Sequence, residues 1–403
     1  MNVASFPEPL MKVLIYTHAF APSTGGVETY VMLLAEGLSR RSSGKDDHFE
    51  VTVATQTPAG DMNDALTPFR IVRRPSQLAL ASLVRNADVI HAAGPALPPL
   101  ILAWLLRKPA VVEHSGYQSI CPNGLLLYGR KRVLCPGHFM ARRYIECVRC
   151  NTDEWGWASS LRSMLLMFPR RWLCRRVACN VGPTRHMAKR SALPNTEVIF
   201  HGVPTSETAS TYAKDRSEPI CFAYVGRLVV EKGVPVLLHA SSQLAEQGFD
   251  FRVKILGDGP ERQNLQNISQ QLRLGGRVEF LGSVPLKRVS EILGRIDAIV
   301  MPSICEEVAG LTAIEQMMRG HLVIASGIGG LCEVVAATGL TFPPGDVGAL
   351  ANCMRRVLEN PGIVAEFGNA ARSRALALFN KDRMVEGHVS IYRKALNGNV
   401  LQS

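Results

Sequence analysis

The sequence predicts an α/β protein made of two doubly wound, Rossmann-like domains that face a central cleft. Short β-branched runs alternate with helical stretches, which is typical of parallel α/β architecture. The alternation stops at a polar stretch, residues 205–218, and then restarts. With 403 residues the chain is long enough for two domains, and ligands of open α/β sheets bind at the carboxyl ends of the strands.

The first domain is expected to span residues 1–204. Its patterning predicts a helix over residues 27–40, directly after the first strand, and a loop-rich insertion over residues 115–155. Short apolar runs rich in β-branched residues predict the strands of this domain: residues 13–16, 51–54, 89–91, 110–114 and 178–181.

The second domain is expected to span residues 205–375, with the polar stretch as its linker. Helical patterning continues from residue 347 to residue 396, and residues 376–403 are expected to form a C-terminal helical segment. Further apolar runs predict the strands of this domain: residues 221–225, 251–256, 278–281, 298–301 and 322–325.

Composition narrows the class of partner. Hydrophobic residues make up 47% and charged residues 20%, as in a globular protein, and no apolar run reaches the roughly 18 residues of a membrane span. The net charge of +11 indicates an anionic partner. Basic residues are densest over residues 142–190, where no aromatic platform is interleaved with them. Anionic lipid and phosphorylated small molecules are therefore favoured over nucleic acid.

The cellular location is expected to be the cytoplasm. The first residues, M-N-V-A-S-F-P-E-P-L, show neither the basic nor the apolar region of a signal peptide. Ten cysteines in a chain without a secretory signal suggest free thiols in a reducing compartment.

The most informative stretch is residues 302–320, P-S-I-C-E-E-V-A-G-L-T-A-I-E-Q-M-M-R-G. It follows an apolar run that predicts a buried strand, and residues 311–318 predict a helix. Glu307 then lies in the turn between strand and helix, with Glu315 two helical turns further on, on the order of 10 Å away. That distance matches the one from a hexose to the ribose of a sugar nucleotide.

The start of this helix offers a place for the diphosphate between the two sugars. Its first N–H groups, near residues 308–310, have no carbonyl partner in the helix and favour a bound phosphate. One segment would thus hold sugar, diphosphate and ribose together. The alternative interpretation is that Glu307 caps the helix and Glu315 lies on a solvated face.

A second segment, G-R-L-V-V-E-K-G at residues 226–233, follows a strand and opens a helix. Arg227 would lie at the strand end and offer a planar guanidinium with several donors. Lys232, at the helix start, would offer a compact positive charge. The chain has no D-x-D sequence for a divalent metal, so these two cations are expected to neutralise a diphosphate instead. The alternative is two solvated charges beside a glycine turn.

Two features of the first domain also fall at strand ends. Gly25 and Gly26 lie between the first strand and the first helix, where glycines let the backbone approach a phosphate, or simply form a tight turn. His114 closes the predicted strand 110–114. Its imidazole would donate a hydrogen bond to a sugar hydroxyl or stabilise positive charge at the anomeric carbon, unless it is a structural histidine.

Taken in order, four motifs resemble those of retaining glycosyltransferase family 4, in glycosyltransferase group 1, which has the GT-B fold. They are G-R-L-V-V-E-K-G, I-L-G-D-G-P-E-R, F-L-G-S-V-P and the glutamate stretch at residues 302–320. The N-terminal T-H-A-F-A-P-S-T-G-G-V-E-T fits the same family, so the resemblance covers residues 11–375. It implies a retaining hexosyltransferase that moves a sugar from a nucleotide diphospho-sugar to an acceptor hydroxyl, in cell-surface polysaccharide or glycolipid synthesis.

The resemblance also implies roles for individual residues. Glu307 would contact the donor sugar and Glu315 the ribose hydroxyls. The implied catalytic positions are Glu307, His114, Arg227 and Lys232. The implied donor-binding positions are Gly25, Gly26, Arg227, Lys232, Glu307, Gly310, Leu311 and Glu315. Ala309 stands where the family often has Phe, which leaves the shape of the sugar pocket open.

The implied partners are the nucleotide-sugar donor and a glycan or glycolipid acceptor, with no required cofactor. Two other interpretations remain open. The first is an isomerase on the same fold that epimerises a UDP-sugar, for which the first domain offers only Glu28 and Glu113 as carboxylates near strand ends. The second is a non-catalytic partner subunit, against which the intact set of charged residues argues.

Four cysteines fall in the loop-rich insertion, in C-P-N-G, C-P-G-H and C-V-R-C. They are Cys121, Cys135, Cys147 and Cys150. A structural zinc would stabilise a loop without its own core, although the spacing is irregular. The alternatives are reduced, buried thiols or a role of the insertion in acceptor binding.

A basic, apolar run occupies residues 159–176, S-S-L-R-S-M-L-L-M-F-P-R-R-W-L-C-R-R. Apolar residues beside arginines and a tryptophan suggest peripheral contact with anionic lipid on the inner face of a membrane. The alternative is a core helix with a solvated basic edge. Pro169 is expected to break a single long helix here, which weakens the membrane interpretation.

Overall fold

A computed structural model of the chain describes residues 10–41, 48–129, 132–205, 219–284 and 286–400. The chain divides into two compact units, described separately below. The first comprises Met1–Leu125, Gly137–Gly202 and Asn380–Ser403, and the second Leu126–Pro136 and Val203–Phe379. The linker predicted at residues 205–218 lies outside the described residues, apart from Thr205.

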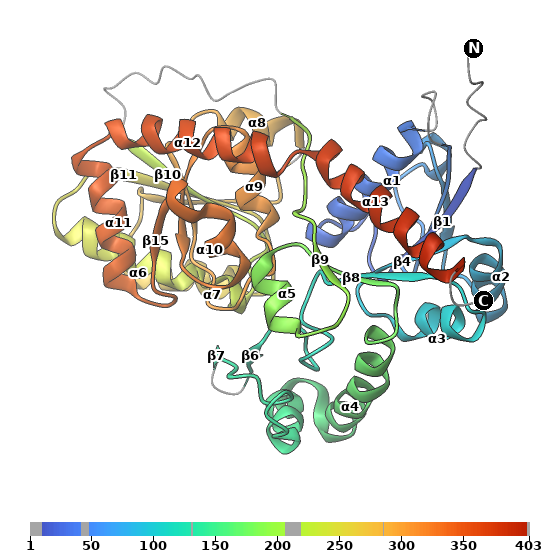
Figure 1. Ribbon diagram of the computed structural model, residues 1–403. Helices are drawn as coiled ribbons and strands as arrows, with labels where there is room; N and C mark the ends of the chain where they lie inside the picture. Colours follow the sequence, from blue (N-terminus) through green and yellow to red (C-terminus); the bar gives the residue numbers. More distant parts are fainter. Residues whose placement is uncertain (1–9, 42–47, 130–131, 206–218, 285, 401–403) are drawn as a thin grey trace, which may run out of the picture. The chain divides into compact units, whose positions relative to one another are not determined.

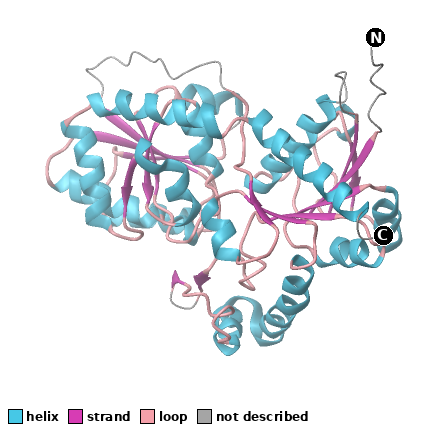
Figure 2. Ribbon diagram, in the orientation of Figure 1, coloured by secondary structure: helices cyan, strands magenta, loops and turns pink. Residues whose placement is uncertain are grey.

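In the described part of the first unit, seven strands form one parallel sheet with helices on both faces (Figures 1 and 2). Their spatial order is β3 (Arg70–Arg73), β2 (Phe49–Thr55), β1 (Met11–Thr17), β4 (Val89–Ala93), β5 (Ala110–Glu113), β8 (Cys179–Gly182) and β9 (Thr196–Val198). The chain steps outward from β1 in one direction and then returns to start again at β4. This doubly wound order places a topological switch point between β1 and β4.

Strand β1 shows why both faces are covered. Val13 and Ile15 join the core beneath helices α1 (Gly26–Arg41) and α13 (Lys381–Val400). Leu14 and Tyr16, which point to the opposite face, join the core beneath α2 (Gln77–Asn86) and α3 (Leu97–Leu105). A parallel strand buried on both faces is continuously apolar, and the sequence of β1 has that pattern.

The C-terminal helix α13 belongs to the first unit, although the sequence suggested a C-terminal segment beginning at residue 376. It packs against α1, beside which it runs in Figure 1. Gly37 of α1 permits this close approach, because a Cβ there would lie 2.4 Å from a methyl carbon of Val385. Arg41 and Glu386 form an ion pair between the same two helices.

Helix α4 (Tyr144–Cys174) corrects one expectation. Pro169 does not end it, and the helix continues to Cys174. The interruption comes earlier, at Gly156, whose φ of 74° and ψ of 165° are not helical. Met164 and Met167 bury one face of the later part against the insertion, and this packing holds the helix through the proline. α5 (Arg185–Ser191) follows β8.

The described part of the second unit contains a six-stranded parallel sheet with the same doubly wound order. In space the strands are β12 (Val278–Gly282), β11 (Phe251–Leu256), β10 (Ile220–Val225), β13 (Ala298–Met301), β14 (Leu322–Ser326) and β15 (Leu340–Phe342). The helices are α6 (Val234–Glu246), α7 (Arg262–Gln271), α8 (Leu286–Leu293), α9 (Leu311–Met318), α10 (Gly329–Val335), α11 (Val347–Glu359) and α12 (Gly362–Leu378). A short antiparallel hairpin, β6 (Leu127–Tyr128) and β7 (Val133–Leu134), also belongs to this unit.

These two parallel sheets confirm the predicted α/β class with two Rossmann-like units. Every predicted strand is present, and the helix predicted over residues 311–318 has those bounds. The sequence missed the short edge strands β3, β9 and β15. Across the described residues, no helix combines the length and apolarity needed to cross a membrane.

Candidate functional site

The glutamate stretch and the two-cation segment meet at the switch point of the second unit. Strands β10 and β13 are neighbours in the sheet, yet the chain leaves them toward opposite sides. Arg227 and Lys232 follow β10, and Glu307 follows β13. Ligands of open α/β sheets bind in the crevice outside the carboxyl ends of such strands.

The two segments touch because one glycine permits it. Gly233 has a φ of 63°, and a Cβ at this position would lie 2.1 Å from the carbonyl oxygen of Pro302. Any side chain here would push the turn that carries Lys232 away from the end of β13. The amide of Ile304 also donates to the carbonyl of Glu231 at 3.0 Å. The backbone therefore brings Lys232 and Glu307 together.

Glu307 accepts two short hydrogen bonds on one oxygen. Lys232 Nζ and Ser303 Oγ each lie 2.6 Å from Glu307 Oε1. Burial alone would raise the pKa of Glu307, but the charge of Lys232, these hydrogen bonds and the charge of Arg227 hold that pKa below its ordinary value. Burial would likewise lower the pKa of Lys232, and the charge of Glu307 instead raises it. Both groups are therefore ionised at neutral pH.

The second carboxylate oxygen of Glu307 has no hydrogen-bond partner within the described ranges. The main chain fixes its position, because the amide of Gly330 donates to the Glu307 carbonyl at 2.6 Å. A Cβ at Gly329 would lie 2.6 Å from the same carbonyl oxygen, so this contact too requires glycine. The arrangement presents one ionised oxygen, on a fixed backbone, to a ligand hydroxyl.

Glu315 lies on α9 and differs from Glu307 in its surroundings. Its side chain is half-buried and makes no hydrogen bond or ion pair within the residues that the structure describes. Burial raises its pKa, and the charge of Arg319 opposes that rise. Gly310, with a φ of 70°, and Leu311 open the helix, whose first amides lack helical partners. The Glu315 carboxylate is thus left without a direct hydrogen-bond or ion-pair partner in the described part of this unit.

Arg227 is exposed, and its side chain makes no hydrogen bond or ion pair in the described part of the chain. Its backbone is held, because the hydroxyl of Tyr224 donates to its carbonyl oxygen at 2.7 Å. Its charge lies close enough to contribute to the low pKa of Glu307. The second unit therefore gathers both predicted cations and Glu307.

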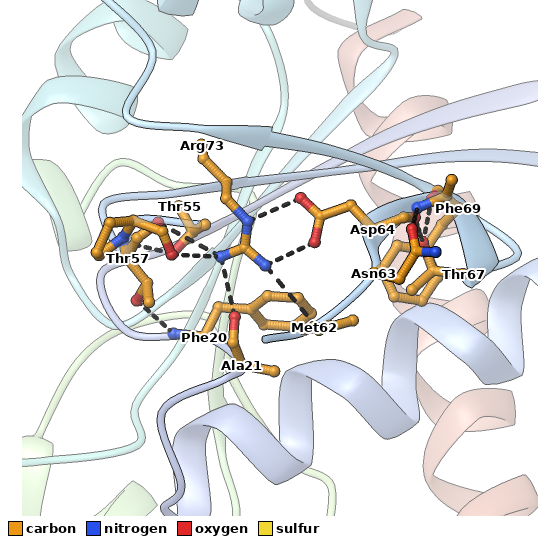
Figure 3. Close-up of polar contacts among 12 residues, drawn as sticks. Phe20, Ala21, Thr55, Thr57, Met62, Asn63, Asp64, Thr67, Phe69 and Arg73 are labelled. Carbon is orange, nitrogen blue, oxygen red and sulfur yellow. Dashed lines mark hydrogen bonds and ion pairs between the residues drawn. The ribbon is translucent and has the colours of Figure 1, made fainter. Parts of the chain in front are cut away.

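The other predicted residues belong to the first unit. Gly26 is the first residue of α1, and Gly25 precedes it. Figure 3 shows what holds the preceding loop: Arg73 forms a two-pronged ion pair with Asp64, with both nitrogen–oxygen distances 2.7 Å. The same guanidinium donates to the carbonyl of Ala21 at 2.9 Å. The glycine pair therefore follows a loop that is held by Arg73, at the end of β3, whose guanidinium is itself fixed by Asp64.

His114 follows β5 and is fully buried. Its Nε2 lies 2.9 Å from Asn180 Oδ1, and its Nδ1 has no hydrogen-bond partner among the described residues. Burial lowers its pKa, so the imidazole is neutral at neutral pH. Nothing in the local sequence indicated Asn180, because the contact joins strands 66 positions apart in the chain.

A buried polar cluster next to His114 was also missed. Glu113 accepts from His201 Nε2 at 3.1 Å and lies 3.4 Å from His388 Nε2. The hydroxyl of Tyr30 lies 3.0 Å from the same His388 nitrogen and 3.1 Å from His91 Nε2. Burial would raise the pKa of Glu113, but these histidines lower it to about 2. Glu113 is therefore a structural carboxylate, fully enclosed by α1, β4 and α13.

The four cysteines of the insertion form no disulfide, and no group of three or more His, Cys, Asp or Glu in the described residues is placed to hold a metal. Cys121 Sγ donates to Asn123 Oδ1 at 2.9 Å, and Asn123 Nδ2 lies 3.7 Å from Cys150 Sγ. An amide side chain thus lies between two of the thiols. The zinc interpretation stays a prediction.

Comparison with known protein families gives two matches. Residues 24–207 match the model described as Glycosyltransferase Family 4, and residues 209–374 match the model described as Glycosyl transferases group 1. The two matches adjoin near the boundary between the units.

Curated proteins resemble parts of this chain. A 2-deoxystreptamine glucosyltransferase of Streptomyces kanamyceticus is 36% identical over 143 residues, which is 35% of this chain and 37% of that protein. A glycogen synthase of Mycobacterium tuberculosis is 28% identical over 251 residues, or 60% of each chain. The matches therefore span less than two thirds of the length of these relatives.

Solved structures resemble the whole fold. A sucrose-phosphate synthase of Thermosynechococcus elongatus superposes with a TM-score of 0.74 at 20% identity, over 96% of this chain and all of the other. HepE of Anabaena in complex with UDP and glucose gives 0.69 at 19% identity, over 94% and 98% of the two chains. At these identities the likeness establishes the fold.

Proposed function

This chain belongs to the glycosyltransferases of the GT-B fold, and from that premise we propose that it moves a sugar from a nucleotide diphospho-sugar to an acceptor hydroxyl with retention of configuration. The observation that carries the proposal is the Lys232–Glu307–Ser303 group at the switch point of the second unit. It offers a fixed cation and an ionised carboxylate oxygen at the place where sheets of this kind bind ligands. The binding of UDP and glucose by HepE supports a nucleotide-sugar donor.

In the proposed reaction the acceptor oxygen bonds to the anomeric carbon as the bond from that carbon to the diphosphate oxygen breaks. Attack comes from the face that the diphosphate leaves, so configuration is retained, and the acceptor proton passes to the departing phosphate. Arg227, Lys232 and the first amides of α9 stabilise the negative charge on the leaving group. Glu307 orients the sugar through a hydroxyl and does not act as a nucleophile.

The direct test is a donor screen followed by product analysis. UDP-, GDP- and ADP-sugars are compared first by thermal shift, because a ligand of the native state raises the melting temperature. The stabilising donor is then incubated with glycan and glycolipid acceptors, and the anomeric configuration of the product is read by NMR. We expect an acceptor-dependent product of retained configuration. An inverted product would refute the retaining mechanism, and an isomerised donor formed without acceptor would refute transfer.

No observation favours the isomerase alternative. That reaction needs acid and base carboxylates from the first unit, and Glu113 is fully buried among histidines and tyrosines. Glu28 is the other carboxylate near a strand end there, and it lies against Gly25. A non-catalytic role is disfavoured by the short ion pair between Lys232 and Glu307 at the proposed donor site.

Transfer is expected to proceed without a divalent metal. The motivation is the pair of cations beside Glu307 and the absence of a D-x-D sequence. Initial rates measured in excess EDTA should remain within about twofold of the untreated rate, a change of roughly 0.4 kcal/mol in the barrier. Complete loss that magnesium or manganese restores would show that a metal neutralises the leaving diphosphate.

Replacing each of the two glutamates should change a different kinetic constant. Glu315→Gln should mainly raise KM for the donor, because the ribose does not change during the reaction. Glu307→Gln should lower kcat about tenfold or more, equivalent to roughly 1.4 kcal/mol, because positive charge develops on the sugar. The readout is kcat and KM at saturating acceptor, with exposed Glu279→Gln in the same unit as control. A Glu307→Gln variant with full kcat would contradict this division.

We further propose that the first unit docks on an anionic bilayer, as the basic run at residues 159–176 suggested. Five exposed apolar side chains on α3 and α4 form what we call the aromatic surface: Trp104, Trp157, Leu165, Phe168 and Trp172. Those on α4 recur at helical spacing, so they share one face of the helix. Trp104 and Trp172 pack edge to face at 5.2 Å. Tryptophan rings suit the boundary between lipid headgroups and acyl chains.

Cations adjoin this surface. The guanidinium of Arg176 lies 3.8 Å above the Trp172 ring. Trp104 and Arg176 also line a cavity of about 1240 Å³, whose wall carries Arg107, Lys108 and Lys394 against one carboxylate, Glu197. The charge complements a phosphate headgroup, and this supports an anionic lipid as the partner. A cytoplasmic location stays a prediction.

Vesicle sedimentation tests the docking proposal. The protein should bind phosphatidylglycerol-containing vesicles and release them as salt rises, whereas uncharged phosphatidylcholine vesicles should bind weakly. Trp104→Ala with Trp172→Ala should lower the vesicle partition coefficient about 10²-fold or more, since aromatic side chains that become buried in the bilayer contribute roughly 1.5–3 kcal/mol each. Leu66→Ala, an exposed leucine outside the aromatic surface, serves as control. Equal binding by the double variant would refute this surface.

A further inference from the structure

The orientation of the Asn180 amide group is determined by two backbone carbonyls. Asn180 Nδ2 lies 2.9 Å from the carbonyl oxygen of Cys174 and 2.9 Å from that of Pro194. A carbonyl oxygen only accepts hydrogen bonds, so the NH₂ group must face these two atoms. Asn180 Oδ1 therefore points the other way, toward His114 Nε2 at 2.9 Å.

This orientation settles which nitrogen of His114 carries the proton. Asn180 Oδ1 is an acceptor, so His114 Nε2 must be the donor and must bear the hydrogen. Burial lowers the pKa of His114, and Asn180 is buried too, so the imidazole is neutral and carries one proton. The remaining nitrogen, Nδ1, is then an unprotonated acceptor. It is buried and has no partner among the residues described.

We propose that Asn180 is a positioning residue that fixes the tautomer of His114, so that His114 Nδ1 accepts a hydrogen bond from a hydroxyl of the bound sugar. A buried acceptor without a partner is uncommon in native proteins, and a ligand hydroxyl supplies the missing donor. The sequence had suggested that His114 donates to the sugar, and the contact with Asn180 reverses that direction. The part that concerns the sugar rests on the proposed glycosyltransferase function, whereas the tautomer does not.

The tautomer can be measured without any substrate. Long-range proton–nitrogen NMR spectra of ¹⁵N-histidine-labelled protein distinguish a protonated from an unprotonated ring nitrogen. The His114 signals are assigned by their absence from the His114→Gln variant, in which the Gln amide can still donate to Asn180. Between pH 6 and 8 we expect Nε2 protonated and Nδ1 unprotonated. A protonated Nδ1, or a mixture of tautomers, overturns the inference whether or not the enzyme proves to be a glycosyltransferase.

Two variants test the positioning role. Asn180→Ala removes the acceptor for Nε2, so the His114 signals should change to a mixture of tautomers, which a purely structural effect on folding would not produce. The kcat/KM should fall about tenfold, the equivalent of one ordinary hydrogen bond. If Asn180→Ala fails to fold, His114→Gln gives the second measurement, since it keeps the contact with Asn180 and lacks Nδ1.

The sugar contact has its own readout. UDP-glucose, GDP-mannose and ADP-glucose are each added to the labelled wild-type protein, and the one that raises the melting temperature should shift the His114 Nδ1 signal. The same donor should bind His114→Gln about tenfold more weakly. A donor that binds without shifting Nδ1 refutes the contact and leaves the tautomer standing. Failure of every donor to bind would instead refute the proposed function and, with it, the sugar contact.

Discussion

Replacing Lys232 with alanine should lower kcat about 10²–10³-fold, a loss of roughly 2.7–4 kcal/mol of transition-state stabilisation. Two effects act together in this variant. The leaving diphosphate loses a cation held in place by the Glu307 carboxylate 2.6 Å away. Glu307, which is mostly buried, also loses the charge that keeps its pKa low, and its ionised form becomes less favourable.

The measurement is steady-state kinetics with the donor that the screen identifies. Lys254→Ala is the matched control, because it removes a lysine–glutamate pair from the same unit, between β11 and β12, with a longer separation of 4.0 Å. The control should keep wild-type kcat within about twofold, since exposed pairs contribute little. Arg227→Ala should also lower kcat. If Lys232→Ala kept full turnover at unchanged stability, Lys232 would not be part of the donor site.

Local sequence patterns were sufficient to predict the central strands of each sheet and the bounds of one helix. Central strands such as β1 and β13 are buried on both faces, so their sequences are continuous apolar runs. Helix α9 has a glycine before it and another, Gly320, shortly after it, and its bounds were predicted without error. The edge strand β3, by contrast, has the sequence R-I-V-R and is only partly buried, and it carries no such pattern.

Local rules were weakest where long-range packing decides the outcome. Pro169 was expected to end α4, yet Met167 before it and Leu173 after it are both buried, and the loss of one hydrogen bond is tolerated. Gly156, which carried no special signal, interrupts the helix instead. Sequence periodicity indicates which face of a helix is buried. It does not indicate at which proline or glycine tertiary packing will keep the helix intact.

The candidate site shows the same limit. Glu307 and Arg227 were predicted because they follow predicted strands, and Lys232 because it lies where the next helix opens; the sheet order brings these strand ends together. Ser303 also lies in the predicted turn, but its hydrogen bond to Glu307 depends on a side-chain direction that spacing does not reveal. Asn180 is remote in sequence from His114, and only the pairing of β5 with β8 places them together.

The buried cluster around Glu113 predicts a large effect on stability. Glu113→Ala should lower the free energy of unfolding by about 3–5 kcal/mol, because it removes one partner of a buried charged and hydrogen-bonded group. The partners left behind are His201, which follows β9, and His388 of α13. Glu50→Ala, which removes an exposed ion pair with Lys12, is the matched control and should change stability by about 1 kcal/mol or less.

The same cluster should make the folded state sensitive to acid. Glu113 has a pKa of about 2 in the folded chain against an ordinary value of 4.5, so its stabilisation is complete above 4.5 and is lost as pH falls toward 2. Burial lowers the pKa of His91 from 6.5 to about 3, so between these values only the unfolded chain binds the His91 proton, and stability falls with pH there too.

Urea unfolding of wild type from pH 7.5 to 3 should therefore show stability declining from about pH 6.5. Glu113→Gln should make the decline below about pH 4.5 shallower and leave the part above it unchanged, because the His91 contribution remains and continues down to about pH 3. A wild-type stability that stays level down to pH 4 would contradict the neutral, buried state of His91, and an unaltered acid limb in Glu113→Gln would contradict the charged state of Glu113.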